Sequence, residues 1–290
     1  MGENITAFGR QVIFVNPSYL VKTIIIQKLL EMEYEVYYVD SPRSVKAILR
    51  KFPHSMCLID VDSSMAAEEF LNFIASIEND PEFSDVLISV LTRRMASLQK
   101  LFNEKLKISA GYINTSSNKD ALLQELKSLF DCYEVKGRRQ FVRVSLPPGS
   151  GAQFYCKVQG IPTHFPLRDI SSCGFACDAK GYPEAAFTVN SLIPGELQLG
   201  TTILPCSVVL FTIKRFDTTL ILVMLFAQTN AWSNKKIIQS FVAEKMQKTI
   251  DEIRASAPAD EMDYSQDVDA KKKKDGDSSA DEQPPADSGQ

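Results

Sequence analysis

The strongest constraint on the fold is the spacing of apolar residues, which changes character near Val135. Before that point, short apolar runs alternate with longer stretches in which apolar residues recur at helical spacing. A strand followed by a helix, repeated along the chain, is typical of a parallel sheet covered on both faces. The expected strands are Val12–Val15, Val36–Val39, Met56–Ile59, Val86–Leu91 and Ala110–Ile113, and the expected helices cover about 18–32, 42–51, 65–78, 94–105 and 118–131.

Two of these helices carry recognisable start signals. Ser41 precedes Pro42, so a serine cap followed by proline at the first helical position predicts a helix that begins at Pro42. The last helix of this region has Ser117 or Asn118 in the capping position.

From Val135 to about residue 227 the chain consists of short β-type runs separated by Pro- and Gly-containing turns. Two long runs, Cys206–Phe216 and Thr219–Ala227, are separated only by Asp217-Thr218, which predicts a hairpin. This spacing favours an antiparallel sheet or small barrel. Helical periodicity then returns over residues 233–254.

Charge divides the chain in the same way. Residues 1–133 hold 14 Lys and Arg against 17 Asp and Glu, whereas residues 134–254 hold 14 against 9, a net charge of +5. Residues 255–290 hold 4 against 10 and few apolar residues, so we expect a disordered acidic tail. The predicted organisation is an α/β domain (1–133), a basic β domain (134–254) that suits an anionic partner, and this tail.

The α/β region resembles the receiver domains of response regulators, which accept a phosphoryl group on an aspartate with the help of Mg²⁺. Asp60 ends the third strand where the family has its acceptor, and Thr92 suits the hydroxyl position. Asn16-Pro17 replaces the acidic pair that holds the metal, and Thr115 stands where the family has a lysine. The resemblance therefore implies a degenerate receiver that serves as an interaction platform, with a phosphorylation-dependent response regulator as the alternative.

Two short motifs stand at the start of the β-rich region. Arg138, Arg139 and Arg143 form R-R-x-x-x-R, and Asp169, Ser171 and Gly174 form D-x-S-x-x-G about thirty residues later. Together, in this order, they resemble the PilZ domain, the bacterial receptor module for cyclic di-GMP. The resemblance implies a six-stranded antiparallel barrel with a C-terminal helix and a ligand site made of these six residues.

The residue types suit such a ligand, which has two phosphodiester anions and two guanines. An arginine fork can pair with phosphate oxygens or with guanine O6 and N7, and its plane can stack on a purine. Asp169 can accept hydrogen bonds from guanine N–H groups, and Ser171 can donate or accept. Gly174 lacks a Cβ, which would allow a base to approach the backbone closely.

Within the family the module is not an enzyme and regulates motility, adhesion, polysaccharide export or virulence through a protein partner. The sequence shows no Ser/His/Asp order, Gly-rich phosphate loop or metal-ligand cluster, so we expect no catalytic residue, metal or cofactor. A PilZ scaffold that has lost the nucleotide remains an alternative. Because the arginines lie between the domains, we expect the ligand to order this segment and to change how the domains sit.

The sequence predicts a cytoplasmic protein. Its longest apolar stretch, Leu220–Ala227, is far shorter than the roughly 20 residues of a membrane-spanning helix, and the first residues do not resemble a signal peptide. DNA binding is not expected, because acidic residues flank the lysine run at 271–274. The protein partner cannot be deduced from the residues.

Overall fold

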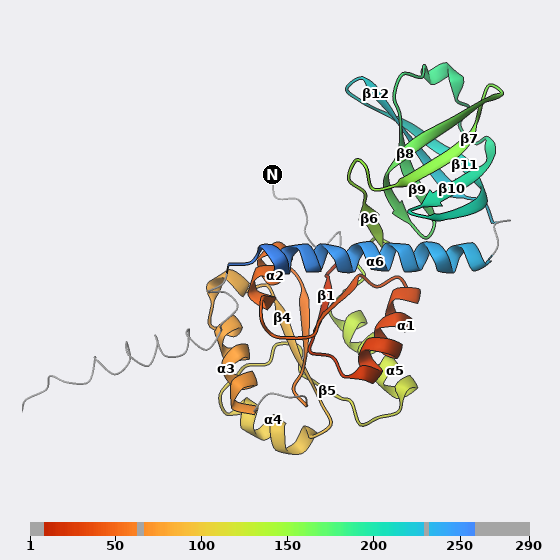
Figure 1. Cartoon of the computed structure of the whole chain (residues 1–290). Coiled ribbons are helices and arrows are strands. Elements are labelled where there is room, and N and C mark those ends of the chain that lie inside the picture. Colours follow the sequence, from red (N-terminus) through yellow and green to blue (C-terminus); the bar gives the residue numbers. More distant parts are fainter. Residues whose placement is uncertain (1–8, 63–66, 229–231, 259–290) are drawn as a thin grey trace, which may run out of the picture.

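The computed structural model describes residues 9–62, 67–228 and 232–258, which form two domains and a long helix between them (Figure 1). Most of the predicted acidic tail, residues 259–290, lies outside the described residues. The predicted fold class is confirmed: the first domain is a parallel α/β sheet and the second an antiparallel barrel.

The first domain has a five-stranded parallel sheet in the order β2-β1-β3-β4-β5. One apolar core contains the side chains of Ile13 and Val15, and a second contains those of Val12 and Phe14, because successive strand residues point to opposite faces. The strands are β1 (Val12–Val15), β2 (Val36–Val39), β3 (Met56–Asp60), β4 (Leu87–Thr92) and β5 (Tyr112–Asn114). The helices are a π-helical turn (Val21–Ile25) that continues into α1 (Ile26–Glu31), then α2 (Val45–Lys51), α3 (Ala67–Glu78), a 3-10 turn (Pro81–Phe83), α4 (Met95–Asn103) and α5 (Lys119–Cys132).

The second domain is a barrel of six antiparallel strands, closed by the pairing of β8 with β9, and β6 adds to the outside edge of β8. Apolar side chains alternate inward along each strand, as Leu220, Leu222 and Met224 do on β12. The strands are β6 (Arg143–Ser145), β7 (Ala152–Val158), β8 (Ile161–Ser171), β9 (Gly174–Ala179), β10 (Leu192–Leu199), β11 (Thr202–Phe216) and β12 (Thr219–Phe226), with a 3-10 turn at Glu184–Ala186.

The helix α6 (Trp232–Ser256) follows the barrel in sequence but lies along the first domain, as Figure 1 shows. Its buried residues belong to the same apolar core as residues of the sheet and of the barrel, so the core is continuous from one domain to the other. The residues that α6 contributes are Ile238, Phe241, Val242, Met246 and Ile250.

Gln247 of α6 covers the free edge of the parallel sheet. Its carboxamide donates to the Tyr38 carbonyl oxygen at 2.9 Å and accepts from the Tyr38 N–H at 3.3 Å. Because β2 is an edge strand, these two backbone groups have no neighbouring strand to pair with. One side chain thus replaces a strand neighbour at this position.

Of the two predicted helix starts, one is confirmed and one is wrong. Asn118 caps α5 as predicted, accepting from the N–H groups of Asp120 and Ala121. The prediction for α2 is wrong: Ser41 accepts only from the Arg43 N–H, and the helix begins at Val45 after Ser44, whose φ of +66° breaks the helical path. None of the helices in the described part of the chain is both long and apolar enough to cross a bilayer.

Replacing Gln247 by alanine should leave the Tyr38 amide and carbonyl without their protein partner. We expect a loss of about 1–2 kcal/mol in the free energy of unfolding and faster hydrogen exchange of the Tyr38 amide. The matched control is Lys248→Ala, since Lys248 is exposed and pairs only loosely with Glu252 at 3.8 Å. Equal melting temperatures for the two variants would show that α6 does not depend on this contact.

Candidate ligand site at the domain junction

The arginine motif lies in the segment that joins α5 to β6. Arg138 and Arg139 are exposed in the turn after α5, and Arg143 is exposed as the first residue of β6. The start of this segment is fixed to the first domain, because the Arg10 N–H donates to the Val135 carbonyl oxygen at 2.8 Å. Three cationic side chains are therefore displayed on a short connection between the domains.

Strand pairing brings the second motif to the first. Arg143 of β6 lies opposite Ser171 of β8, and Ser145 lies opposite Asp169. The Arg143 guanidinium lies 3.6 Å from the Asp169 carboxylate, so residues 26 positions apart form an ion pair across the two motifs. Burial raises the pKa of Asp169, although Arg143, the Ala176 N–H, Arg168 and Arg139 each act to lower it.

Ser171 and Gly174 hold the β8–β9 hairpin together. Ser171 is buried, and its hydroxyl donates to the Gly174 carbonyl oxygen at 3.0 Å and lies 3.2 Å from the Cys173 sulfur. A Cβ at Gly174 would collide with the carbonyl oxygen of Met224 on the neighbouring strand. The structure therefore provides a reason for glycine that the sequence did not indicate, namely the close packing of β9 against β12.

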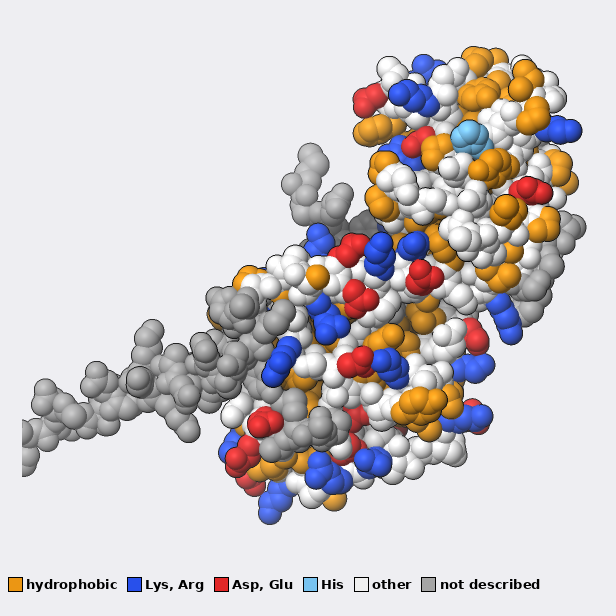
Figure 2. All heavy atoms as spheres, viewed as in Figure 1, with side chains coloured by type: hydrophobic (Ala, Val, Ile, Leu, Met, Phe, Trp, Pro, Cys, Tyr) orange, Lys and Arg blue, Asp and Glu red, His pale blue; other side chains and the backbone are white. Residues whose placement is uncertain are grey.

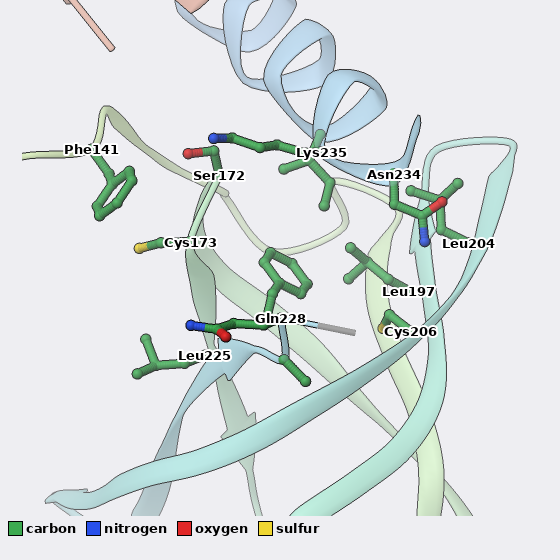
Figure 3. Close-up of a pocket in the computed structure, with 13 residues that line it drawn as sticks. Phe141, Ser172, Cys173, Leu197, Leu204, Cys206, Leu225, Gln228, Asn234 and Lys235 are labelled. Atoms are coloured by element: carbon green, nitrogen blue, oxygen red, sulfur yellow. The ribbon is translucent and has the colours of Figure 1, made fainter. Parts of the chain in front are cut away.

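A cavity of about 640 Å³ opens beside the hairpin, between the end of the barrel and the first turns of α6. Figure 3 shows Phe141 and Cys173 at one side of it, with Leu197 and Cys206 at the other. Phe141 stands between Arg139 and Arg143 in the arginine motif, so the cavity adjoins both motifs. Its walls are largely apolar, and its polar side chains are Ser172, Gln228, Asn234 and Lys235.

One residue that sequence reasoning missed comes from the first domain. Glu33, in the turn between α1 and β2, accepts hydrogen bonds from the Val142 N–H and the Ser172 hydroxyl. Val142 precedes Arg143, and Ser172 lies inside D-x-S-x-x-G, so one carboxylate contacts both motifs. No local pattern could have indicated it, because the contacts span 109 and 139 residues.

The receiver-like site of the first domain is occupied by internal contacts. Asp60 is buried, and its carboxylate oxygens accept hydrogen bonds from the N–H groups of Ser18 and Asp62 at 3.0 and 3.1 Å. Burial raises the pKa of Asp60, and these two N–H groups oppose that rise. The Asn16 carboxamide donates to the Asp60 carbonyl oxygen at 3.3 Å rather than supplying a metal-binding carboxylate.

Asp62, two residues after the candidate acceptor, binds the Thr92 hydroxyl and the guanidinium groups of Arg93 and Arg94. It accepts from Thr92 Oγ1 at 2.9 Å and from the Nε groups of Arg93 and Arg94 at 3.3 Å. Burial would raise the pKa of Asp62, but these donors and the Arg93 N–H outweigh it and lower the pKa. The hydroxyl that the family uses on a phosphoryl group is thus bonded to a carboxylate, and among the described residues no cluster of His, Cys, Asp or Glu is placed to hold a metal ion.

No protein-family model matches the sequence, and no curated protein matches it. Among solved structures the chain is similar to the PilZ domain with c-di-GMP of YcgR from Escherichia coli, at 16% identity over 41% of this chain and 99% of that chain, with a TM-score of 0.35. It is similar to MrkH of K. pneumonia in its c-di-GMP complex at 15% identity, over 41% of this chain and 57% of that one, with a TM-score of 0.36.

A third similar structure is the phosphorylated cyanobacterial phytochrome response regulator RcpA, at 18% identity over 43% of this chain and 94% of that chain, with a TM-score of 0.33. Both families that the sequence resembles are thus represented among the similar structures. The chain spans little more than half the length of MrkH. The fold class of each domain rests on the strand orders given above.

Replacing Gly174 by alanine should destabilise the barrel even without ligand, because the new Cβ meets the backbone of β12. We expect a loss of about 1–3 kcal/mol in the free energy of unfolding, measured by chemical denaturation. Lys180→Ala, at an exposed position just beyond β9, is the control and should change stability by less than about 0.5 kcal/mol. If G174A were as stable as the wild type, packing against β12 would not explain the glycine, and close approach of a ligand would remain as its explanation.

Acetyl phosphate with Mg²⁺ should not phosphorylate the protein, because the Asp60 carboxylate already accepts two backbone hydrogen bonds and Thr92 is bonded to Asp62. Intact-mass spectrometry should show an unchanged mass. An adduct of one phosphoryl group that disappears in the D60N variant would contradict this expectation and favour a phosphorylation-dependent regulator.

Proposed function

We propose that the protein is a bacterial, cytoplasmic receptor for cyclic di-GMP that passes the signal to a protein partner. The observation that carries the proposal is the pairing of β6 with β8. It sets Arg143 3.6 Å from Asp169 and leaves Arg138 and Arg139 exposed on the same short segment. A cluster of arginine forks beside a carboxylate suits a ligand that carries both phosphates and guanines.

In this proposal the arginines and the aspartate bind different parts of the ligand. The guanidinium groups of Arg138, Arg139 and Arg143 take the phosphodiester oxygens or the O6 and N7 edge of guanine. Asp169 accepts from the guanine N–H groups, most strongly when it is ionised; burial raises the pKa of Asp169, and the surrounding arginines oppose that rise. Ser171 and Gly174 give the hairpin the shape on which the ligand rests.

The cavity beside the hairpin offers room for a flat apolar face of the ligand. Its volume of about 640 Å³ is within the usual range for sites that bind small molecules. Phe141 lies at its edge with an exposed fraction of 37%, so it can stack on a base without moving out of the protein core.

The protein is proposed to act by binding and not by catalysis, with no cofactor or metal. The receiver-like domain would supply the surface for a partner protein in motility, adhesion or virulence regulation, since Asn16-Pro17 and Thr115 replace the acidic pair and the lysine that phosphotransfer needs. DNA is not a proposed partner.

Arg139→Ala and Arg143→Ala should each weaken cyclic di-GMP binding. Loss of one bidentate contact costs about 1–3 kcal/mol, which is roughly ten- to hundredfold in affinity by titration calorimetry. Arg215→Ala is the matched control, because Arg215 is an exposed arginine at the far end of β11 that pairs with Glu184. Affinity that stays unchanged in both motif variants, with folded barrels by circular dichroism, would remove the arginine segment from the site.

A further inference from the structure

Glu33 holds an unusual position in the first domain. Its φ of +62° places a residue with a side chain in the left-handed region, which costs roughly 1–2 kcal/mol compared with an ordinary helical or extended conformation. Such a conformation persists only where the surrounding contacts determine it. Here it ends α1: the Glu33 N–H donates to the Leu30 carbonyl oxygen and the Tyr34 N–H donates to the Leu29 carbonyl oxygen, both at 3.0 Å. The helix end thereby presents the Glu33 carboxylate to the other domain and to α6.

The Glu33 carboxylate accepts three hydrogen bonds from three separate segments. The Val142 N–H donates to Oε2 at 3.1 Å, and the Ser172 hydroxyl donates to Oε1 at 2.5 Å. The Gln239 carboxamide of α6 donates to Oε1 at 2.9 Å. One half-buried side chain therefore joins the arginine segment, the β8–β9 hairpin and α6 to the first domain.

These donors form a set that suits any oxyanion. A backbone N–H, a hydroxyl and a carboxamide converge on one point, and Arg139 and Arg143 line the narrow cleft that contains Glu33. Charged acceptors form the stronger hydrogen bonds, and a carboxylate oxygen and a phosphodiester oxygen are acceptors of the same class. The anion position between the two motifs is thus filled by a carboxylate of the neighbouring domain.

We propose that Glu33 is an internal competitor of the anionic ligand, so that domain docking and ligand binding exclude each other at this position. The inference rests on the proposed receptor function, which it deepens. A phosphate that enters among Val142, Ser172 and the arginines meets the negative charges of Glu33 and Glu35, which line the same cleft. Glu33 must leave for the phosphate to take its donors.

Departure of Glu33 would remove three of the hydrogen bonds that link the first domain to the barrel and to α6, while α6 keeps its apolar packing against the sheet. Gln239 would lose its hydrogen bond to the Glu33 carboxylate and keep only the longer contact of 3.5 Å with the Glu31 carbonyl oxygen. Gln247, eight residues further along, keeps both hydrogen bonds to Tyr38. Eight residues of helix span about 12 Å, so the two attachments are well separated. The barrel can therefore change its orientation about the first part of α6, which lies between the domains in Figure 1.

The test uses the full chain with Glu33→Gln and Glu33→Ala, and Glu31→Gln as the control. Glu31 lies two residues earlier, and its carboxylate pairs with Lys28 at 3.1 Å, so the control removes an equal charge outside the cleft. Both Glu33 variants should bind cyclic di-GMP more tightly than the wild type, by roughly five- to hundredfold, the usual size of a coupling between two sites. The control should match the wild type.

The opposite result has a distinct meaning. Weaker or equal binding in both Glu33 variants, with intact folds, would overturn the competition and leave Glu33 as a structural support. Small-angle scattering supplies a second readout. The ligand-free Glu33→Ala protein should resemble the ligand-bound wild type, and identical scattering of all forms would overturn the change in orientation of the barrel.

A ligand-independent arm separates this inference from the receptor assignment. In the absence of any nucleotide, Glu33→Ala should speed hydrogen exchange of the Val142 amide at least tenfold, whereas Glu31→Gln should not. Inorganic phosphate should slow that exchange in Glu33→Ala more than in the wild type. If no form binds cyclic di-GMP, the receptor proposal fails, and these exchange results still decide whether Glu33 occupies an anion site.

Discussion

The docking of α6 against the edge of the parallel sheet is the interaction on which the arrangement of the molecule depends. The helix leaves the barrel and buries its apolar side chains in a core that also contains residues of the first domain. Because no strand of the described residues lies on the outer side of β2, its backbone groups need other partners, and Gln247 supplies them at Tyr38. A helix that belongs to one domain by sequence thus completes the other by packing.

The candidate site depends on that arrangement. The antiparallel pairing of β6 with β8 brings the arginine motif to the aspartate motif and places Arg143 diagonally across from Asp169, within reach of its ion pair. β6 is short and starts directly after the interdomain segment, so its path is fixed at one end by the barrel and at the other by contacts of Val135 with the first domain. The candidate site therefore depends on contacts with both domains. Figure 2 shows acidic and basic side chains side by side over α6, where the two domains meet.

The sequence predicted those features that have a local cause. Strands buried on both faces form continuous apolar runs, so Val12–Val15 and Val36–Val39 coincide with the observed β1 and β2. The Asp217-Thr218 turn was predictable because two long β-type runs flank it, and Asp217 adopts a φ of +50° there. The two motifs lie together in the fold through the pairing of β6 with β8, and the ligand that their residue types suit stays a prediction.

Features with a distant cause left no such signal. The helix α2 begins at Val45 and not at the predicted Pro42, because Ser44 adopts a left-handed conformation that the Ser-Pro capping pattern does not reveal. Glu33 and Gln247 stand in ordinary polar positions of the sequence, and their contacts span 109 to 209 residues. The role of Gly174 was also hidden, because it depends on the approach of β12. The contacts of Glu33 and Gln247 between the domains can be identified only from the folded structure.

A receiver-like domain that lacks the metal-binding acidic pair and the lysine can still carry information through its docking energy. If the first domain holds the barrel through Glu33 and the ligand needs the same donors, linkage requires the effect to be reciprocal. A partner that binds the docked form would lower the affinity for the ligand by some factor, and the ligand would lower the affinity for that partner by the same factor. Under that proposal the first domain would respond to the ligand by a change of position, with no phosphoryl group on Asp60.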